Sequence, residues 1–379
     1  MPRSSLEPPV EAGPTPTGPE PNLHKLSTAL RDRVEVRSLA ITGLFVLAAF
    51  YTLYFARAFF LPVVFAILLD FLFSPVLRIL KRGRIPEPVG AALVILGLLG
   101  FVGAGAYSLA QPARSWVSRA PASMEQIRGK LRLIRRPVQE VSRAAEQVEK
   151  AARAPASESG PAEVVVKGPT AAERLFGTTQ TIVIGAIEVL ILLYFLLAAG
   201  DLFLQKMINV LPSFGDKRRA VEIARETEAS ISTYLVTLTL LNVGEALAVT
   251  GAMYLVGVPN PLLWGVLAGL VEFIPYIGPT VLLLVLAAAG LTTFDTLGHA
   301  LLVPGAYLVV NFVQSNLVSP LIMGQRLTLN PVAIFIGLAF WWWIWGVPGA
   351  FIAVPLLATL KIFCDHIETL APIGEFLGR

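Results

Sequence analysis

The amino-acid sequence predicts an all-α, polytopic membrane protein with about eight transmembrane segments, two of them broken or re-entrant, and a helical extramembrane insert. Composition is the first observation. Of the 379 residues, 55% are hydrophobic and 15% are charged, whereas soluble domains carry roughly 25% charged residues. The mean hydropathy of +0.69 agrees with this. A soluble fold could not bury that much apolar surface, so we expect lipid to cover it.

The second observation is a series of apolar stretches, each long enough to cross a hydrocarbon core of about 30 Å as a helix. They occupy residues 39–55, 58–77, 89–110, 178–199, 231–256, 261–290, 300–324 and 331–360. The expected domain organisation follows from them. It comprises a disordered, proline-rich cytoplasmic tail (1–38), segments one to three (39–110), an extracytoplasmic helical insert (111–177) and segments four to eight (178–379).

Lysine and arginine residues indicate the orientation, because they concentrate in short cytoplasmic loops. Basic residues precede the first stretch and gather after the second and the fourth, whereas the loop after the first holds only Arg57. We therefore expect the amino terminus in the cytoplasm. If both broken stretches cross the membrane there are eight spans, and if both return there are six. Either number leaves the carboxyl terminus in the cytoplasm.

The insert carries apolar residues from Ile127 to Ala152 at alternating spacings of four and three, the pattern of a heptad seam. Two interpretations stay open: an amphipathic helix lying on the membrane or on the protein itself, and a coiled coil for self-association. Pro137 interrupts the seam under either one. We also expect a homo-oligomer, since spans joined by short loops pack readily against one another.

The third observation is that the sixth and eighth stretches are both too long and interrupted. Each would form about 45 Å of helix at 1.5 Å per residue. The sixth contains IPYIGP at 274–279 and the eighth contains WGVPG at 345–349. Proline removes a backbone donor and clashes with the preceding turn. Irregular backbone at membrane depth must be buried in protein or line a water-filled cavity, and paired interruptions point to a transporter's binding site.

Asparagine and proline recur around the two breaks in the same order, as Asn242, Asn260, Pro261 and then Asn311, Asn330, Pro331. Asparagine can cap the free N–H groups at a helix start, and proline fits the first helical turn. We interpret residues 231–290 and 300–360 as a degenerate repeat, each a helix followed by a broken helix. Chance similarity is the alternative.

Acidic side chains within spans are costly and are by default functional candidates. Four lie within the apolar stretches: Asp70, Glu188, Glu245 and Glu272. Glu272 is expected at the end of a half-helix, where it either handles solute or protons or caps freed backbone groups. The candidate substrate- or ion-binding residues are Glu272, Pro275, Gly278, Pro279, Glu245, Asn242, Asn311, Gln314, Gly346, Pro348 and Gly349.

Several kinds of chemistry find no support in the sequence. It contains no GxxxxGK[ST], HExxH or GxSxG motif, so we expect neither ATP-driven pumping nor hydrolysis, and no catalytic residues. The single cysteine, Cys364, and three distant histidines provide no disulfide framework and no metal site. We expect no cofactor. The pI of about 9.2 fits basic membrane-protein loops, so nucleic acid is not an expected partner.

Long motifs in the last third of the chain carry a family resemblance: GVPNP at 257–261, EFIPYIGP at 272–279, NLVSPLIMG at 316–324 and WGVPGAFIAVP at 345–355. The chain resembles the autoinducer-2 exporter family of bacterial membrane proteins over about residues 39–379. The resemblance implies an all-helical inner-membrane transporter that exports autoinducer-2. It also implies that sodium or lithium/proton antiport occurs among relatives. Val236 and Thr237 stand where many relatives carry Gly-Gln, so no role of that pair is carried over.

Three functions stay open. The first is export of a small polar solute such as autoinducer-2, secondary or facilitated, through a cavity between the two breaks. The second is monovalent cation/proton antiport, which needs a titrating carboxylate at membrane depth, with Glu272 and Glu245 as candidates. The third is a non-transporting membrane scaffold whose insert is the working part. None of the three is an enzyme.

Overall fold

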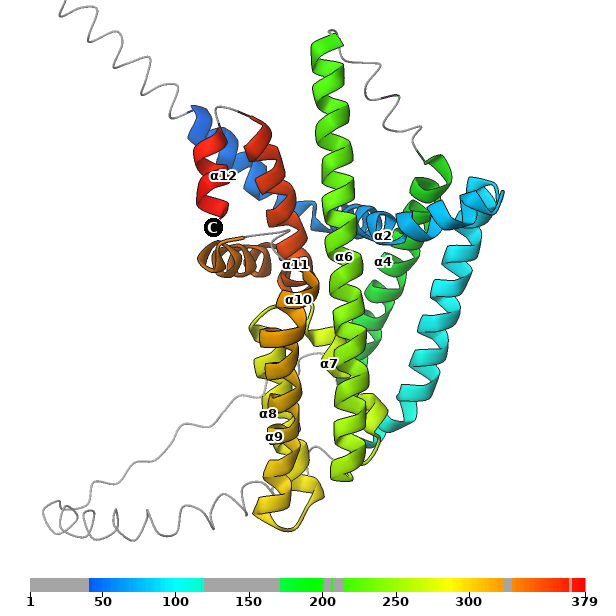
Figure 1. The fold of residues 1–379 in the computed structure, drawn as a ribbon, viewed down its shortest axis with the longest axis vertical. Coiled ribbons are helices and arrows are strands. Elements are labelled where there is room, and N and C mark those ends of the chain that lie inside the picture. Colours follow the sequence, from blue (N-terminus) through cyan, green and yellow to red (C-terminus); the bar gives the residue numbers. More distant parts are fainter. Residues whose placement is uncertain are drawn as a thin grey trace, which may run out of the picture. The chain divides into compact units, whose positions relative to one another are not determined.

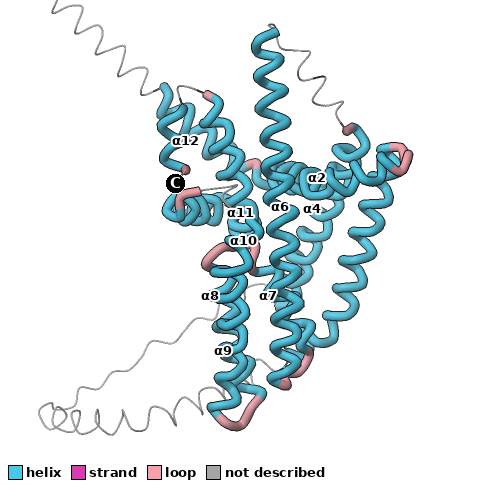
Figure 2. Tube along the Cα trace, viewed as in Figure 1, coloured by secondary structure: helices cyan, strands magenta, loops and turns pink. Residues whose placement is uncertain are grey.

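The computed structural model describes residues 41–116, 118, 171–200, 206, 214–323, 329–367 and 370–378. The tail predicted at 1–38 and most of the insert predicted at 111–177 lie outside these residues. Within the described residues the chain is helical, and its sole β-type pairing is an isolated bridge between Leu329 and Gly378 (Figure 2). The all-α polytopic fold is therefore confirmed.

The chain divides into two compact units, residues 1–56 and residues 57–379. The first contributes the short apolar helix Ile41–Phe55. The helices of the second unit are Arg57–Arg82 (α2), Glu87–Trp116, Ala171–Ala199 (α4), Phe214–Val256 (α6), Pro261–Val271 (α7), Ile277–Thr293 (α8), Leu297–Val313 (α9), the π-helix Gln314–Val318 (η1), Ser319–Met323 (α10), Pro331–His366 (α11) and Ala371–Leu377 (α12).

Helices long and apolar enough to cross a membrane number six in the described part of the chain. They are Arg57–Arg82, Glu87–Trp116, Gln180–Ala199, Ala220–Val256, Leu297–Met323 and Pro331–His366. Length and composition alone place all six in the set, including the last. Its path through space shows that it does not run straight, as described below.

The sixth predicted stretch, 261–290, forms a helical hairpin whose arms are α7 and α8. The Nε2 atom of His299, at the start of α9, lies 3.2 Å from the carbonyl oxygen of Val256, at the end of α6. The chain thus leaves α6 and enters α9 on the same side, so α7 and α8 must travel inward and back (Figure 1). A Cβ added to Gly278 would overlap the Val271 carbonyl oxygen, which makes glycine necessary where the arms diverge.

The eighth predicted stretch forms a second hairpin, because α11 consists of two helices that meet at a kink at Gly346. Gly346 adopts φ 66° and ψ −145°, a conformation that is essentially open to glycine alone. A Cβ on Gly337 would meet the side chain of Leu357, whereas in a straight helix these positions lie about 30 Å apart. The arms 331–345 and 347–366 therefore pack antiparallel. Both predicted breaks return, and neither crosses.

The two hairpins enter from opposite sides and their tips meet. The first begins where α6 ends, and the second begins after α9, η1 and α10 have run back across the unit. At the tips Phe273 stacks on Phe351, with ring centroids 4.9 Å apart and an interplanar angle of 18°. Ile274 is buried in the same cluster as Leu338 and Ala350. Contacts between the tips thus join the two halves that the sequence suggested as a repeat.

An asparagine precedes each hairpin, but only one of the two caps its helix, which corrects the expectation that both do. The Asn330 side chain accepts a hydrogen bond from the Val332 N–H at 3.0 Å, as a cap should. Asn260 makes no side-chain cap bond and sits instead in the left-handed region, at φ 57°. Asparagine tolerates this conformation better than other residues with a Cβ, so at position 260 it serves the tight turn between α6 and α7.

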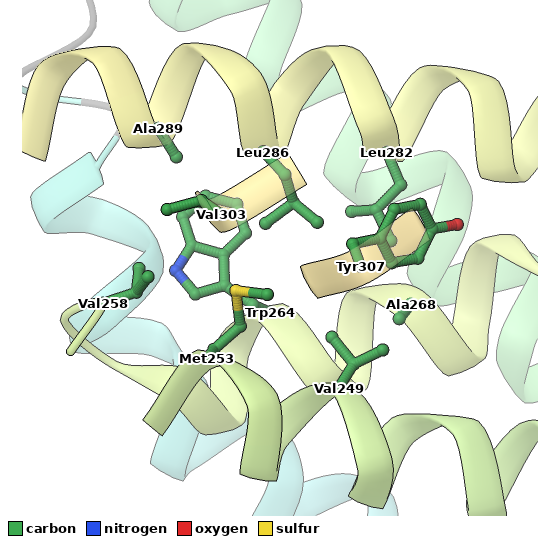
Figure 3. Packing of buried hydrophobic residues seen from close by; sticks show 10 residues of the cluster. All are labelled: Val249, Met253, Val258, Trp264, Ala268, Leu282, Leu286, Ala289, Val303 and Tyr307. Atoms are coloured by element: carbon green, nitrogen blue, oxygen red, sulfur yellow. The ribbon is translucent and has the colours of Figure 1, made fainter. Parts of the chain in front are cut away.

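The apolar core around the first hairpin is built from α6, α7, α8 and α9. Trp264 of α7 packs among Met253 of α6, Leu286 of α8 and Val303 of α9 (Figure 3). The Trp264 ring also meets Trp116, at the end of helix Glu87–Trp116, edge to face at 4.9 Å. A separate cluster joins α2, that same helix and α4. These contacts hold the first hairpin in place along most of its length.

Helix α6 is longer than its predicted apolar stretch of 231–256, because it begins at Phe214. The additional turns are rich in charged residues, and they make contacts that lipid could not offer. Arg78 of α2 lies 3.6 Å from Glu228, and His366 at the end of α11 lies 3.1 Å from Glu226. The charged half of α6 therefore ties α2 and α11 together beyond the apolar region.

The hairpin path of α7 and α8 predicts which residues share a side of the membrane. We predict that Asn260→Cys and Asp295→Cys variants react with a membrane-impermeant maleimide added to the same side, and Glu375→Cys from the other. The wild-type chain is a ready control, because its single cysteine, Cys364, is buried. Labelling of positions 260 and 295 from opposite sides would show that α7 and α8 cross.

The backbone of Gly346 predicts a stability effect. Gly346→Ala should lower the free energy of unfolding by about 1–3 kcal/mol, because a Cβ strains this φ/ψ region. The measurement is the thermal unfolding midpoint of the detergent-solubilised protein. Gly97→Ala is the matched control, since a Cβ there meets no atom within 4 Å. It lies inside a helix and should be neutral or slightly stabilising. Equal midpoints for the two variants would contradict the strain at Gly346.

Candidate functional site

Polar side chains gather where the carboxyl end of α7 meets α6 and α9. They are Asn242 and Glu245 of α6, Glu272 at the end of α7, and Tyr307 and Asn311 of α9, and we call this group the acid-pair site. Glu272 is the C-cap of α7, directly after its last helical residue and before the first hairpin reverses. The predicted half-helix end at Glu272 is therefore present in the structure.

One amide joins the two carboxyl groups of the acid-pair site. The Nδ2 atom of Asn311 donates to Glu245 Oε1 at 3.3 Å and to Glu272 Oε1 at 3.5 Å. Three elements thus converge on a single donor group. Glu245 is only 2% exposed, so water contributes little to its solvation. Among the described residues, the Asn311 amide is the donor that stabilises both carboxyl groups.

Other polar atoms of the site are buried and have no hydrogen-bond partner among the described residues. They are Oε2 of Glu245, Oε2 of Glu272, both side-chain polar atoms of Asn242 and the hydroxyl of Tyr307. Each such buried, unpaired group costs about 1–3 kcal/mol. Figure 3 shows the Tyr307 hydroxyl at the edge of the apolar cluster, pointing away from it, and the hydroxyl interacts electrostatically with both carboxyl groups. A ligand placed here would gain several hydrogen bonds.

Small residues allow this convergence. A Cβ on Gly269 would approach the Asn242 carbonyl oxygen to 2.8 Å, and a Cβ on Gly265 would overlap Ala246. Glycine at both positions lets the backbone of α7 lie directly on α6. Glu272 follows Gly269 by one turn, so this close approach also sets its carboxyl group beside Glu245.

The composition of the acid-pair site limits what it can bind. Within the described residues, no lysine or arginine forms an ion pair with Glu245 or Glu272. Most of the unpaired atoms are oxygen acceptors, which suit a ligand rich in hydroxyl or N–H donors, or a cation. Anions would meet the negative carboxyl groups without a compensating charge, so an anionic ligand is disfavoured.

The proline and glycine residues predicted as candidates lie at the two hairpin tips, outside the acid-pair site. Pro275, Gly278 and Pro279 shape the first tip and contribute no polar side chain. Gly346, Pro348 and Gly349 do the same at the second tip, where a Cβ on Gly349 would overlap the Trp341 carbonyl oxygen. The second tip contacts the chain next to the site through the Phe273–Phe351 stack, one residue beyond Glu272, and through the cluster that contains Ile274.

Three polar residues singled out in the sequence do not join the acid-pair site. Gln314 begins η1, and its Oε1 accepts a hydrogen bond from the Ser315 hydroxyl at 3.4 Å. Asp70, on α2, is repelled by the like charge of Glu228, and Glu188 is exposed on α4. Sequence reasoning also missed Tyr307. A signal for it existed, because Tyr307 lies four residues before Asn311 and so shares its helix face.

Comparison with known proteins gives the chain its family. The sequence model of the AI-2E family transporters matches residues 44–369, which is most of the chain. The chain belongs to this family. This confirms the family expected from its motifs, and the apolar helices agree with a multi-pass membrane protein. The family's matched region contains both hairpins and every residue of the acid-pair site.

Named relatives of this AI-2E family member are transport proteins. The AI-2 transport protein TqsA of Escherichia coli is 32% identical over 43% of this chain and 45% of its own length. The putative transport protein YhhT of the same species is 32% identical over 39% and 42%. YueF of Bacillus subtilis, also a putative transport protein, is 25% identical over 85% and 87%. The chain thus matches under half the length of the first two relatives.

The bridging amide predicts a double-mutant effect. Asn311→Leu should lower the free energy of unfolding by about 1–3 kcal/mol, because two buried carboxyl groups lose their shared donor. Adding Glu245→Gln should restore part of that loss, since it removes the charge that lacks a partner. Thermal unfolding in detergent measures both. Asn316→Leu is the control, because Asn316 is exposed and bonds only to its own helix. Additive effects of the first two changes would show that the bridge contributes nothing.

Proposed function

We propose that this transporter exports a small, neutral, hydroxyl-rich solute of the autoinducer-2 type, bound at the acid-pair site. The observation that carries the proposal is the set of buried, unpaired polar atoms beside the first hairpin tip. A solute with several hydroxyl donors would satisfy Glu245, Glu272 and Asn242 together, and such pairing supplies specificity because its absence leaves them unpaired. The name of the relative TqsA supports the choice of solute.

The place of the acid-pair site in the fold supports transport over mere binding. It lies at the inner end of one hairpin, near the contact with a second hairpin that enters from the other side. Discontinuous helices near the membrane midplane are typical of transporter binding sites, where irregular backbone meets substrate. We place the protein in the bacterial inner membrane with both termini in the cytoplasm. Transport is then outward and either gradient-driven or facilitated.

A second function, monovalent cation/proton antiport, is favoured by one specific observation. Glu245 and Glu272 share a single donor and have no ion-paired lysine or arginine among the described residues. A cation or a proton would balance such a pair directly. Export and antiport therefore assign roles to the same residues, so the experiment must distinguish between the two functions.

The test uses purified protein in liposomes preloaded with autoinducer-2, with and without an imposed proton gradient. Liposomes that contain the wild-type protein should release the solute faster than preloaded liposomes without protein. Glu272→Gln and Glu245→Gln should each weaken apparent affinity about 10- to 100-fold, because a hydrogen bond to a charged group contributes about 1.5–3 kcal/mol. Glu188→Gln is the matched control and should behave as wild type, since Glu188 is exposed on α4.

Three outcomes separate the two functions. Release that is lost in both glutamine variants but kept in the control supports export through the acid-pair site. No release by the wild type, together with dissipation of a pH gradient on addition of Na⁺, would replace export with antiport. Normal release by both glutamine variants would show that the solute does not bind at the acid-pair site.

A further inference from the structure

A second site lies between α2 and α6, away from the acid-pair site. A cavity of about 450 Å³ opens there, which falls in the range of about 300–1,000 Å³ typical of small-molecule sites. Its walls differ in character. Arg78 and Arg82 of α2 and the hydroxyls of Ser232 and Thr237 of α6 supply the polar part, while Ile79 and Val236 belong to the apolar part. We call this cavity the α2–α6 groove.

The arginines of the α2–α6 groove are held differently. Arg78 donates from Nη2 to Ser74 Oγ at 2.8 Å and lies 3.6 Å from Glu228 Oε1, so its position is fixed and its charge is offset. Arg82, one turn further on, has no ion-pair partner among the residues that the structure describes. The groove therefore keeps about one uncompensated positive charge, and hydroxyl-bearing residues are part of its lining.

The position of the α2–α6 groove favours a membrane component over a soluble anion. Arg82 is in the last turn of α2, where the apolar segment ends and basic residues gather. Ile79 is 66% exposed, so the apolar wall of the groove faces the surroundings of the helix, which in a membrane are acyl chains. Basic pockets between transmembrane helices on the cytoplasmic side are suited to anionic headgroups.

We propose that the α2–α6 groove binds the phosphodiester headgroup of an anionic phospholipid. Arg78 and Arg82 contact the phosphate, Ser232 and Thr237 donate hydrogen bonds to its oxygens, and the first carbons of an acyl chain lie against Ile79 and Val236. A phosphodiester carries one negative charge, which matches the uncompensated charge at Arg82. In a zwitterionic lipid the positive ammonium group of the headgroup already offsets the charge of the phosphodiester, so such lipids bind more weakly.

The test measures lipid binding to the full-length, detergent-solubilised protein by native mass spectrometry, with phosphatidylglycerol and phosphatidylcholine as probes. Wild type should prefer phosphatidylglycerol. Arg78→Gln with Arg82→Gln should reduce that preference about thirtyfold, since each arginine near a membrane surface contributes about 1 kcal/mol. Arg84→Gln with Arg218→Gln removes the same charge outside the groove and should leave the preference unchanged.

A second variant tests the proposal independently, in case the double arginine variant misfolds or the lipid is attracted to the arginines by charge alone. Val236→Trp fills the groove but keeps both arginines, and it should also abolish the preference for phosphatidylglycerol. Thermal unfolding shows whether each variant is folded. An unchanged preference in a folded Arg78→Gln/Arg82→Gln or Val236→Trp variant overturns the proposal. The proposal is also overturned if inorganic phosphate or glycerol phosphate displaces bound phosphatidylglycerol as effectively as added phosphatidylglycerol does. The groove would then be a soluble-anion site.

Discussion

The reversal of the chain at residues 272–277 is the constraint on which the rest of the structure depends. A chain that turns back inside a membrane must satisfy its backbone without water, so it needs neighbours on every side. Helices α6 and α9 supply them, and both run beside the first hairpin (Figure 1). Because Gly278 must fit against the Val271 carbonyl oxygen, the geometry of the turn leaves little freedom. Glu272 is fixed in place as a result.

The elements of this fold could be read from the sequence where local chemistry decides them. The prolines of IPYIGP and the glycines of WGVPG interrupt their helices wherever those helices lie, so both breaks were predictable. Asn330 was predictable as a cap for the same reason. Whether a broken stretch crosses or returns was not predictable, because contacts between distant residues decide it. The contact of His299 with Val256 and the packing of Gly337 on Leu357 are such contacts.

For the candidate site too, the sequence indicates which residues take part but not how they come together. Its acids and Asn311 stood out because charges and amides are rare in apolar stretches. Their convergence on the Asn311 amide depends on how closely α7 approaches α6, which sequence spacing does not reveal. Gln314 starts the π-helix η1 and bonds to its neighbour Ser315, a local interaction that sequence spacing does not reveal either.

The first hairpin also has an electrical consequence. At its tip the carboxyl end of α7 and the amino end of α8 lie close together. A helix carries about half a negative charge at its carboxyl end and about half a positive charge at its amino end. The tip therefore bears a small transverse dipole in a medium of low dielectric constant, where such fields are weakly screened. A solute with its own dipole would be turned to a defined orientation before it meets either carboxyl group.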